Sequence, residues 1–250
     1  MTPLPLNYEP KRIGQSDKPV NVTEFQQRLA SLGFLRHTRL DILHATHQLA
    51  KHGSSPTTYS NEMMNHLLGY LKNNPVYSRK FYNTDSEKNQ LVALTDAAFA
   101  NSGENWKSTS GNIVYYCSSL VHASSATQRQ IATSAPEAEL FEVIKSTKML
   151  LHLKGLAEDM KERDIEVALL TDSSSSVGTV HSPVTSKYKY LSVYITFVKN
   201  IVAEVGLKVV HLLRDHNFAD LMTKQSDFAT FSNMWKRATE PFQWRHESKE

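Results

Sequence analysis

The sequence has almost no cysteine and no long apolar run, and each absence excludes a class of protein. Cys117 is the only cysteine among 250 residues, so neither an internal disulfide nor a zinc site built on cysteines can form. No stretch approaches the roughly 18 apolar residues that a transmembrane helix needs. The first 20 residues also lack the apolar segment of a secretory signal. We therefore expect an intracellular protein that makes no contact with a membrane.

Glycine is also scarce, with nine residues in the chain, and no glycine-rich phosphate-binding loop of the GxGxxG or GxxxxGK[ST] type is present. A small-ligand enzyme built on a dinucleotide-binding fold therefore has little support.

The chain has an ordinary globular composition with a slightly basic first part. Hydrophobic residues make up 40% and charged residues 21%, enough to form a core in one or two domains. Residues 1–90 contain 11 Lys and Arg against 7 Asp and Glu, and the remainder is nearly balanced. This asymmetry fits either a surface that contacts a phosphate backbone or a solvated basic face.

Hydrophobic periodicity divides the chain into a helical part and an α/β part. Residues 1–20 are expected to form an extended lead-in, and residues 21–75 a small all-α subdomain. Its three predicted helices are 22–35, 40–51 and 59–72.

From residue 76 the pattern changes to short strands alternating with helices, which predicts a mixed β-sheet flanked by helices over residues 76–226. A C-terminal helix and tail are expected over 227–250. The predicted strands are 76–82, 91–95, 112–117, 120–123, 130–133, 167–171 and 207–213. A Ser/Gly-rich connection is expected after residue 171. The predicted helices are a long one from Pro136, then 190–205, 218–224 and 228–237.

Acidic residues stand at positions where strands and helices often present chemical groups. Asp96 and Asp172 each follow an apolar strand that ends in Thr, and Glu139 and Asp220 lie in first helical turns. If they converge, such carboxylates can hold two Mg²⁺ ions about 4 Å apart for phosphodiester hydrolysis. An Asp at a strand end is equally common as a turn former or helix cap.

The sequence around these acids resembles that of a known family. Lys107–Gly111 (KSTSG), Gln128–Thr133, Ser134–Leu140 (SAPEAEL) and Ala219–Lys224 (ADLMTK) resemble the ribonuclease H domain of copia-type (Ty1/copia) retrotransposon Pol polyproteins. Upstream, Phe25–Gly33 and Thr38–Ile42 resemble the end of the reverse transcriptase, its connection or thumb region. The resemblance covers roughly residues 20–230.

The resemblance implies an RNase H-like fold in which Asp96, Glu139, Asp172 and Asp220 bind two Mg²⁺ ions, with Mn²⁺ as a substitute. Glu139 is preferred to Glu137 because Leu140 follows it. The implied reaction is hydrolysis of the RNA strand of an RNA–DNA hybrid during reverse transcription. The polymerase part of a Pol polyprotein is the implied partner, and a cytoplasmic retroelement particle and the nucleus are the implied locations.

Several further residues are candidates for substrate contact. For each of them the alternative interpretation is a solvated turn or loop residue. Lys107 and Ser108 could meet a phosphate or a ribose 2′-hydroxyl, and Gln128 and Arg129 are similar candidates. His216, four residues before Asp220, could assist proton transfer or product release.

The sequence also departs from the family. Ser173–Ser176 follows Asp172 where many members have Asn-Gln-Ser-Ala, and no adjacent Asp pair of a polymerase palm is present. We therefore expect a C-terminal fragment or truncated product that does not synthesise DNA by itself. The rival reading is a catalytically inactive retroelement-derived module that binds nucleic acid or a partner.

Overall fold

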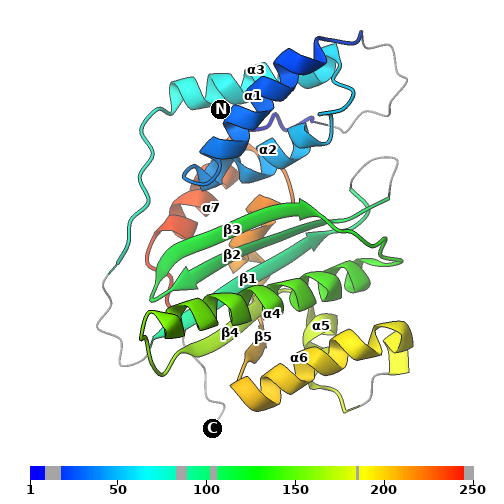
Figure 1. Cartoon of the computed structure of the whole chain (residues 1–250), viewed down its shortest axis with the longest axis vertical. Helices are drawn as coiled ribbons and strands as arrows, with labels where there is room; N and C mark the ends of the chain where they lie inside the picture. The colour runs from blue at the N-terminus through cyan, green and yellow to red at the C-terminus, as the bar shows by residue number, and fades with distance from the viewer. Residues whose placement is uncertain (9–17, 83–88, 102–105, 184–185, 245–250) are drawn as a thin grey trace.

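A five-stranded mixed sheet forms the centre of the protein (Figure 1). The structure is a computed structural model that describes residues 1–8, 18–82, 89–101, 106–183 and 186–244. The strands lie in the order β3-β2-β1-β4-β5, with β1, β2 and β3 antiparallel and with β4 and β5 parallel to β1. Their bounds are β1 Gln90–Ala98, β2 Thr109–Tyr116, β3 Ser119–Thr127, β4 Glu166–Thr171 and β5 Lys208–His211.

Helices cover both faces of this sheet because β1 and β4 are apolar on both sides. On one face, α4 (Ala135–Asp159), α5 (Ser174–His181) and α6 (Ser192–Val205) enclose a core around Leu169 and Val143. On the other face, the 3₁₀ helix η5 (Phe218–Met222) and α7 (Phe228–Thr239) enclose a core around Leu94 and Ile113. The predicted RNase H-like fold class, a mixed sheet flanked by helices, is therefore confirmed. Two further 3₁₀ helices belong to this part, η3 (Ser186–Leu191) and η4 (Arg214–His216).

The N-terminal residues form a helical unit with its own core. It consists of α1 (Val22–Leu35), η1 (Leu40–Ile42), α2 (Leu43–Ala50) and α3 (Thr58–Asn73). The Asn21 side chain caps α1 and a Thr57–Ser60 capping box starts α3, so each helix begins where its first N–H groups find acceptors. Leu4 and Tyr8 pack into the same core. Among the described residues, no helix is long and apolar enough to cross a bilayer.

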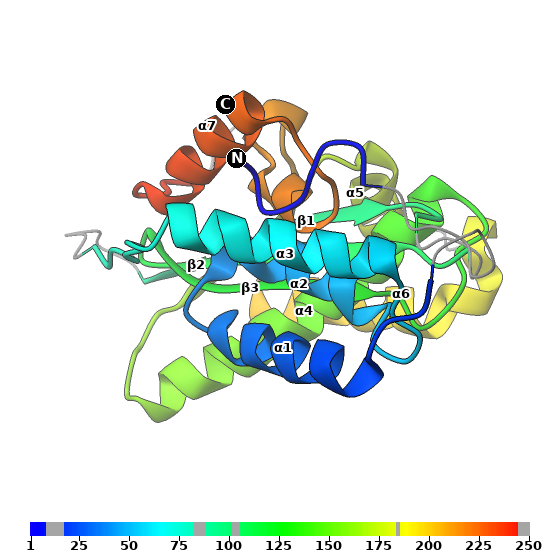
Figure 2. The ribbon, with the colours of Figure 1, turned by 90° about the horizontal axis from the view of Figure 1, so that it is seen from above.

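The helical unit packs against β3 through two histidines on α2, the buried His44 and the half-buried His47. Figure 2 shows α1, α2 and α3 side by side over the sheet. His44 Nδ1 lies 3.1 Å from the Met222 carbonyl oxygen, and His47 pairs with the Ser125 and Thr127 hydroxyls at 3.1 and 3.0 Å. Burial lowers the pKa of His44 to about 4 and of His47 to about 3. Both rings are therefore neutral near pH 7 and hold the unit by hydrogen bonds.

Three local predictions were wrong. Residues 76–82 are irregular rather than a strand, because Val76 and Phe81 are exposed and the segment does not join the sheet. Residues 130–133 are irregular and lead into α4. The predicted Ser/Gly-rich connection contains α5, which the Ser173 side chain starts by accepting a hydrogen bond from the Ser176 N–H.

Gly111 on β2 lies against η5, and this close contact explains why the Lys107–Gly111 motif ends in glycine. A Cβ atom there would stand 2.6 Å from Thr223 Cγ2, 2.7 Å from Met222 Cβ and 3.0 Å from the Ala219 carbonyl oxygen. These distances are too short for any side chain, so the close approach of β2 and η5 requires glycine.

Gly111→Ala is expected to lower the free energy of unfolding by about 1–3 kcal/mol, because the added methyl group overpacks this contact. Urea denaturation measures the change. Gly155→Ala in α4 is the matched control, since nothing lies within 4 Å of its Cβ position. It should be neutral or stabilising by up to about 1 kcal/mol. Equal stability of the two variants would contradict the proposed packing constraint.

Candidate metal centre

Two aspartates of the site are adjacent because β1 and β4 are parallel neighbours. Thr95 of β1 pairs with Thr171 of β4, and Asp96 and Asp172 are the next residues of their chains. Asp96 is almost fully buried at 1% exposure, whereas Asp172 is partly exposed. The repeated Thr-Asp strand ending therefore places two carboxylates at one edge of the sheet.

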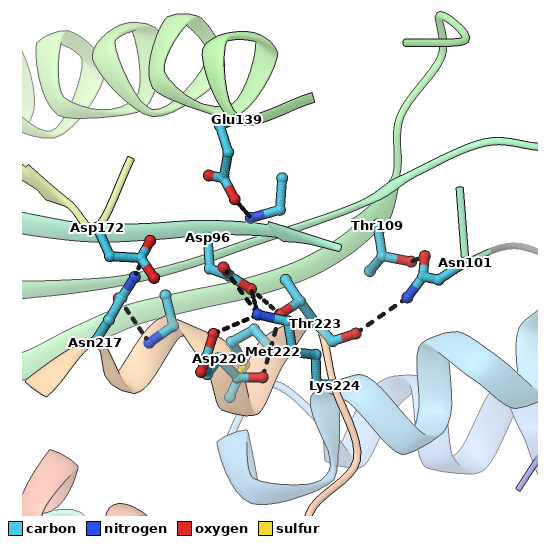
Figure 3. Close-up of polar contacts among 12 residues, drawn as sticks. Asp96, Asn101, Thr109, Glu139, Asp172, Asn217, Asp220, Met222, Thr223 and Lys224 are labelled. Atoms are coloured by element: carbon cyan, nitrogen blue, oxygen red, sulfur yellow. Dashed lines mark hydrogen bonds and ion pairs between the residues drawn. The ribbon is translucent and has the colours of Figure 1, made fainter. Parts of the chain in front are cut away.

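Glu139 reaches the same edge from the first turns of α4 (Figure 3). The Ser134 side chain caps this helix, and the Ala97 N–H donates to Glu139 Oε1 at 3.2 Å. Asp96, Glu139 and Asp172 each have a carboxylate oxygen within 4.8 Å of the others. Glu137, in contrast, accepts a hydrogen bond from the Thr133 N–H at 2.8 Å. The structure thus brings Glu139, and not Glu137, to the two aspartates.

Asp220 joins this cluster through Lys224. Lys224 Nζ lies 2.7 Å from Asp220 Oδ1 and 3.2 Å from the carboxylate of Asp96. The Thr223 hydroxyl donates a hydrogen bond to Asp96 Oδ2. The ammonium group therefore bridges two of the predicted acids from the turn after η5.

Asn217 is a further site residue that the sequence reasoning missed. Its amide nitrogen donates to the Thr95 carbonyl oxygen at 2.9 Å and to Asp172 Oδ1 at 3.3 Å. Its side-chain oxygen accepts from the Ala219 N–H and so starts η5. Thr223 and Lys224 were part of the quoted Ala219–Lys224 motif, but an isolated Asn217 gave no signal in the sequence.

Crowding of like charges perturbs the ionisation of the site. Burial, with the charges of Asp96 and Asp172, raises the pKa of Glu139 to about 9. Burial and the charge of Asp96 also raise the pKa of Asp220, against the opposing effect of Lys224. Burial lowers the pKa of Lys224, but the charge of Asp96 and the contacts with Asp220 outweigh it, so this pKa is raised overall. A proton on Glu139 and the ammonium of Lys224 together reduce the negative charge of the cluster.

The residues present fit a divalent cation. Carboxylate oxygens are the ligands that Mg²⁺ and Mn²⁺ prefer. Glu139 Oε2 is buried and has no hydrogen-bond partner among the described residues. Such an unpaired buried oxygen beside two further carboxylates is a ready ligand position.

The candidates for substrate contact fall into two groups. Ser108 and Gln128 are buried and have structural partners: the Ala100 N–H donates to Ser108 Oγ, and Gln128 Nε2 donates to the Ala138 carbonyl oxygen at 2.8 Å. Lys107 is partly exposed, and Arg129 and His216 are exposed. Only these three have surface available for a ligand.

The mixed sheet with an acidic cluster at one edge has the architecture of an RNase H-like domain. No protein-family model matches the chain. It is 25% identical to the Ty1-GR3 and Ty1-OR Gag-Pol polyproteins of Saccharomyces cerevisiae, over 93% of this chain and 14% of each polyprotein. The chain thus spans about 14% of the length of these relatives. The similarity confirms the resemblance to copia-type Pol polyproteins.

Similar solved structures include LC11-RNase H1, isolated from compost by a metagenomic approach. It has 22% identity and a TM-score of 0.44, with 54% of this chain and 93% of that chain covered. LC11-RNase H1 in complex with an RNA/DNA hybrid gives 23% identity, a TM-score of 0.43 and coverage of 53% and 93%. Prototype foamy virus protease-reverse transcriptase gives 12% identity, a TM-score of 0.35 and coverage of 66% and 22%.

Glu139→Gln is expected to remove a pH dependence from the stability of the ion-free protein. The pKa of Glu139 near 9 lies above the ordinary 4.5, so between these values the folded state holds a proton that the unfolded chain releases. Wild-type stability should therefore fall as the pH rises through this window, and the variant should lose this part of the decline. Urea denaturation in EDTA at about pH 5 and about pH 8 measures it. Glu204→Gln on the exposed side of α6 is the control, and an unchanged pH slope in the Glu139 variant would contradict the burial of a protonated Glu139.

Lys224→Met is expected to lower the thermal stability of the ion-free protein near neutral pH, because Asp96 and Asp220 lose their shared cation. Added Mg²⁺ should then raise the melting temperature by more than in the wild type, since an external cation replaces the missing charge. Thermal unfolding in EDTA and in Mg²⁺ measures both effects. Lys224→Arg keeps the charge and serves as control. A Met variant that melts like the wild type in EDTA would show that Lys224 does not compensate the acids.

Proposed function

We propose that the chain is a metal-dependent ribonuclease H that cleaves the RNA strand of an RNA–DNA hybrid as part of a retroelement Pol polyprotein. The convergence of Asp96, Glu139 and Asp172 at one sheet edge carries this proposal. The similarity to Ty1 Gag-Pol polyproteins over nearly the whole chain supports it. The polymerase part of such a polyprotein is the partner we propose, in a cytoplasmic retroelement particle and in the nucleus.

The four acids have different tasks in this proposal. Asp96, Glu139 and Asp172 would hold two Mg²⁺ ions, or Mn²⁺ in their place, with Asp220 completing the coordination of one ion. When bound, the ions supply an activated water and charge neutralisation at the leaving 3′-oxygen. Glu139 has to release its proton to serve as a ligand. Asn217 fixes the direction of the Asp172 carboxylate through its 3.3 Å hydrogen bond.

The substrate has to approach the exposed side of this cluster. Asn101 and Lys107 lie on the chain between β1 and β2, and Asn101 Nδ2 donates to the Thr223 carbonyl oxygen at 3.2 Å, which places Asn101 beside the site. Polar groups of this kind can contact ribose 2′-hydroxyls, which distinguish RNA from DNA. Recognition would rest on the shape of the hybrid and on its 2′-hydroxyl groups, with little sequence preference.

A second candidate function is a catalytically inactive module that binds nucleic acid or a partner. The ion pairs of Lys224 favour it, because an internal ammonium already occupies the space between Asp96 and Asp220. The Ser173–Ser176 segment after Asp172 also favours it, because many family members have a different sequence at this place. An assay for hybrid cleavage separates the two functions.

The purified chain is expected to cleave the RNA strand of a labelled hybrid in Mg²⁺ or Mn²⁺ and to lose this activity in EDTA. Asp172→Asn should lower the rate about a hundredfold or more, since it removes a ligand whose effect on the transition state is several kcal/mol. Gel electrophoresis of the labelled strand measures it.

Asp164→Asn makes the same chemical change at an exposed turn away from the cluster and should keep the activity. If the folded wild-type chain leaves the hybrid intact in both Mg²⁺ and Mn²⁺, the result rejects the nuclease proposal and favours the binding module.

A further inference from the structure

A buried carboxylate on α4 lies outside the cluster of four acids. Glu142 has an exposure of 0%, and it follows Glu139 by three residues on the side of α4 that faces the sheet. Figure 1 shows α4 lying along this face of the sheet. Burying a carboxylate costs free energy unless hydrogen-bond donors surround it, so the place of Glu142 in the core needs an explanation.

Polar side chains from two strands and from α4 surround Glu142. Asn112 Nδ2 of β2 donates to Glu142 Oε1 at 3.0 Å, and the Ser146 hydroxyl donates to the same oxygen at 2.8 Å. Lys145 Nζ lies 3.4 Å from Glu142 Oε2. The Ser124 hydroxyl of β3 donates to Asn112 Oδ1 at 3.0 Å, so Asn112 is held from its other side as well. We call these five residues the α4 network.

The α4 network lies one step from the metal centre along both the sheet and the helix. Asn112 pairs across the sheet with Thr95, the residue before Asp96. Residues three positions apart lie on the same face of a helix, so Glu142 and Glu139 both point toward the sheet. The hydrogen bond between Asn112 and Glu142 therefore fixes α4 against the sheet within one turn of Glu139.

Glu139 has few contacts of its own. The Ala97 N–H donates to Glu139 Oε1 at 3.2 Å, whereas Glu139 Oε2 has no hydrogen-bond partner among the described residues. Gln128 Nε2 donates to the Ala138 carbonyl oxygen, and the core that α4 shares with the sheet around Val143 is apolar. Apolar contacts are not directional and tolerate small shifts, while hydrogen bonds fix direction and distance. The place of Glu139 thus depends on how α4 is held.

We infer that Glu142 and Asn112 are positioning residues that hold α4 so that Glu139 reaches Asp96 and Asp172. This inference rests on the proposed function, because it relates the α4 network to the metal centre of that function. An apolar pair of similar size would stabilise the core as well or better, since neither side chain would have to lose its hydration. Placement of Glu139 therefore accounts for a buried carboxylate that stability alone does not require.

The test compares the Mn²⁺ affinity of folded variants, measured by electron paramagnetic resonance of the free ion. Mn²⁺ that the wild-type chain binds and Asp172→Asn does not is counted as bound at the metal centre. Asn112→Leu with Glu142→Met replaces the hydrogen-bonded pair by apolar side chains of similar shape. This apolar pair should have a urea midpoint in EDTA at least equal to that of the wild type, and should bind Mn²⁺ about tenfold more weakly.

Asn112→Asp with Glu142→Gln exchanges the donor and the acceptor, and it keeps both the hydrogen bond and the charge. This exchanged pair should restore most of the wild-type Mn²⁺ affinity. Asn200→Leu with Glu158→Met makes the same two replacements as the apolar pair at exposed positions of α6 and α4, and it is the matched control. The control should bind Mn²⁺ like the wild type.

Asn112→Ser is the second variant if the apolar pair fails to fold. It breaks the link between β2 and Glu142 but leaves Ser146 and Lys145 in place, so it should also bind Mn²⁺ more weakly. A merely structural network would leave the Mn²⁺ affinity of every folded variant unchanged. Wild-type Mn²⁺ affinity in the folded apolar pair, or in Asn112→Ser where that pair is unfolded, would therefore overturn the inference.

Cleavage of the hybrid by the same wild-type preparation separates this inference from the proposed function. A wild-type chain that cleaves, together with a folded apolar pair of wild-type Mn²⁺ affinity, would overturn the inference and leave the nuclease standing. Weaker Mn²⁺ binding by the apolar pair of a chain that cleaves no hybrid would support the inference and reject the nuclease. A wild-type chain that neither binds Mn²⁺ at the carboxylates nor cleaves would overturn both.

Discussion

Repulsion among carboxylates at one edge of the sheet is the constraint on which the site depends. Asp96, Glu139 and Asp172 meet there, and Lys224 joins Asp220 to Asp96. Asp96 is buried and the other three are half-buried, so their uncompensated charges would oppose folding. The ion-free protein offsets them with a proton on Glu139, the ammonium of Lys224 and the amide of Asn217. Divalent cations could take over the first two roles. Cation binding would therefore require Glu139 to lose its proton and Lys224 to leave the space between Asp96 and Asp220.

The parts that hold these groups are short and rigid. The parallel pairing of β1 with β4 fixes Asp96 beside Asp172, and the cap of α4 fixes Glu139. The contact of η5 with Gly111 brings Lys224 within reach of Asp96. Each acid is thus set by a backbone constraint, so the geometry does not rely on the acids attracting a metal.

The sequence predicted the parts of the site that follow from periodicity and strand endings. Two apolar strands that both end in Thr-Asp marked Asp96 and Asp172 as candidates without showing that they converge, and the parallel register places them side by side. It could not predict α5, because Ser173–Ser176 has no apolar period and depends on a side-chain cap. The ion pair between Lys224 and Asp96 and the hydrogen bond between His47 and Ser125 each join segments that are far apart in the sequence. A single sequence carries no signal for such pairs.

In the proposed function, the negative charge of the site links substrate binding to metal binding. A nucleic acid that approaches the four acids alone would be repelled, since both carry negative charge. In the proposed function, divalent cations held by the carboxylates would offset that repulsion within the site. The two ligands would then favour each other: a hybrid at the carboxylates would make cation binding more favourable, and bound cations would strengthen the hold on the hybrid by the same factor. The affinity of such a site for nucleic acid would therefore depend on the ion concentration, and its affinity for ions on the nucleic acid.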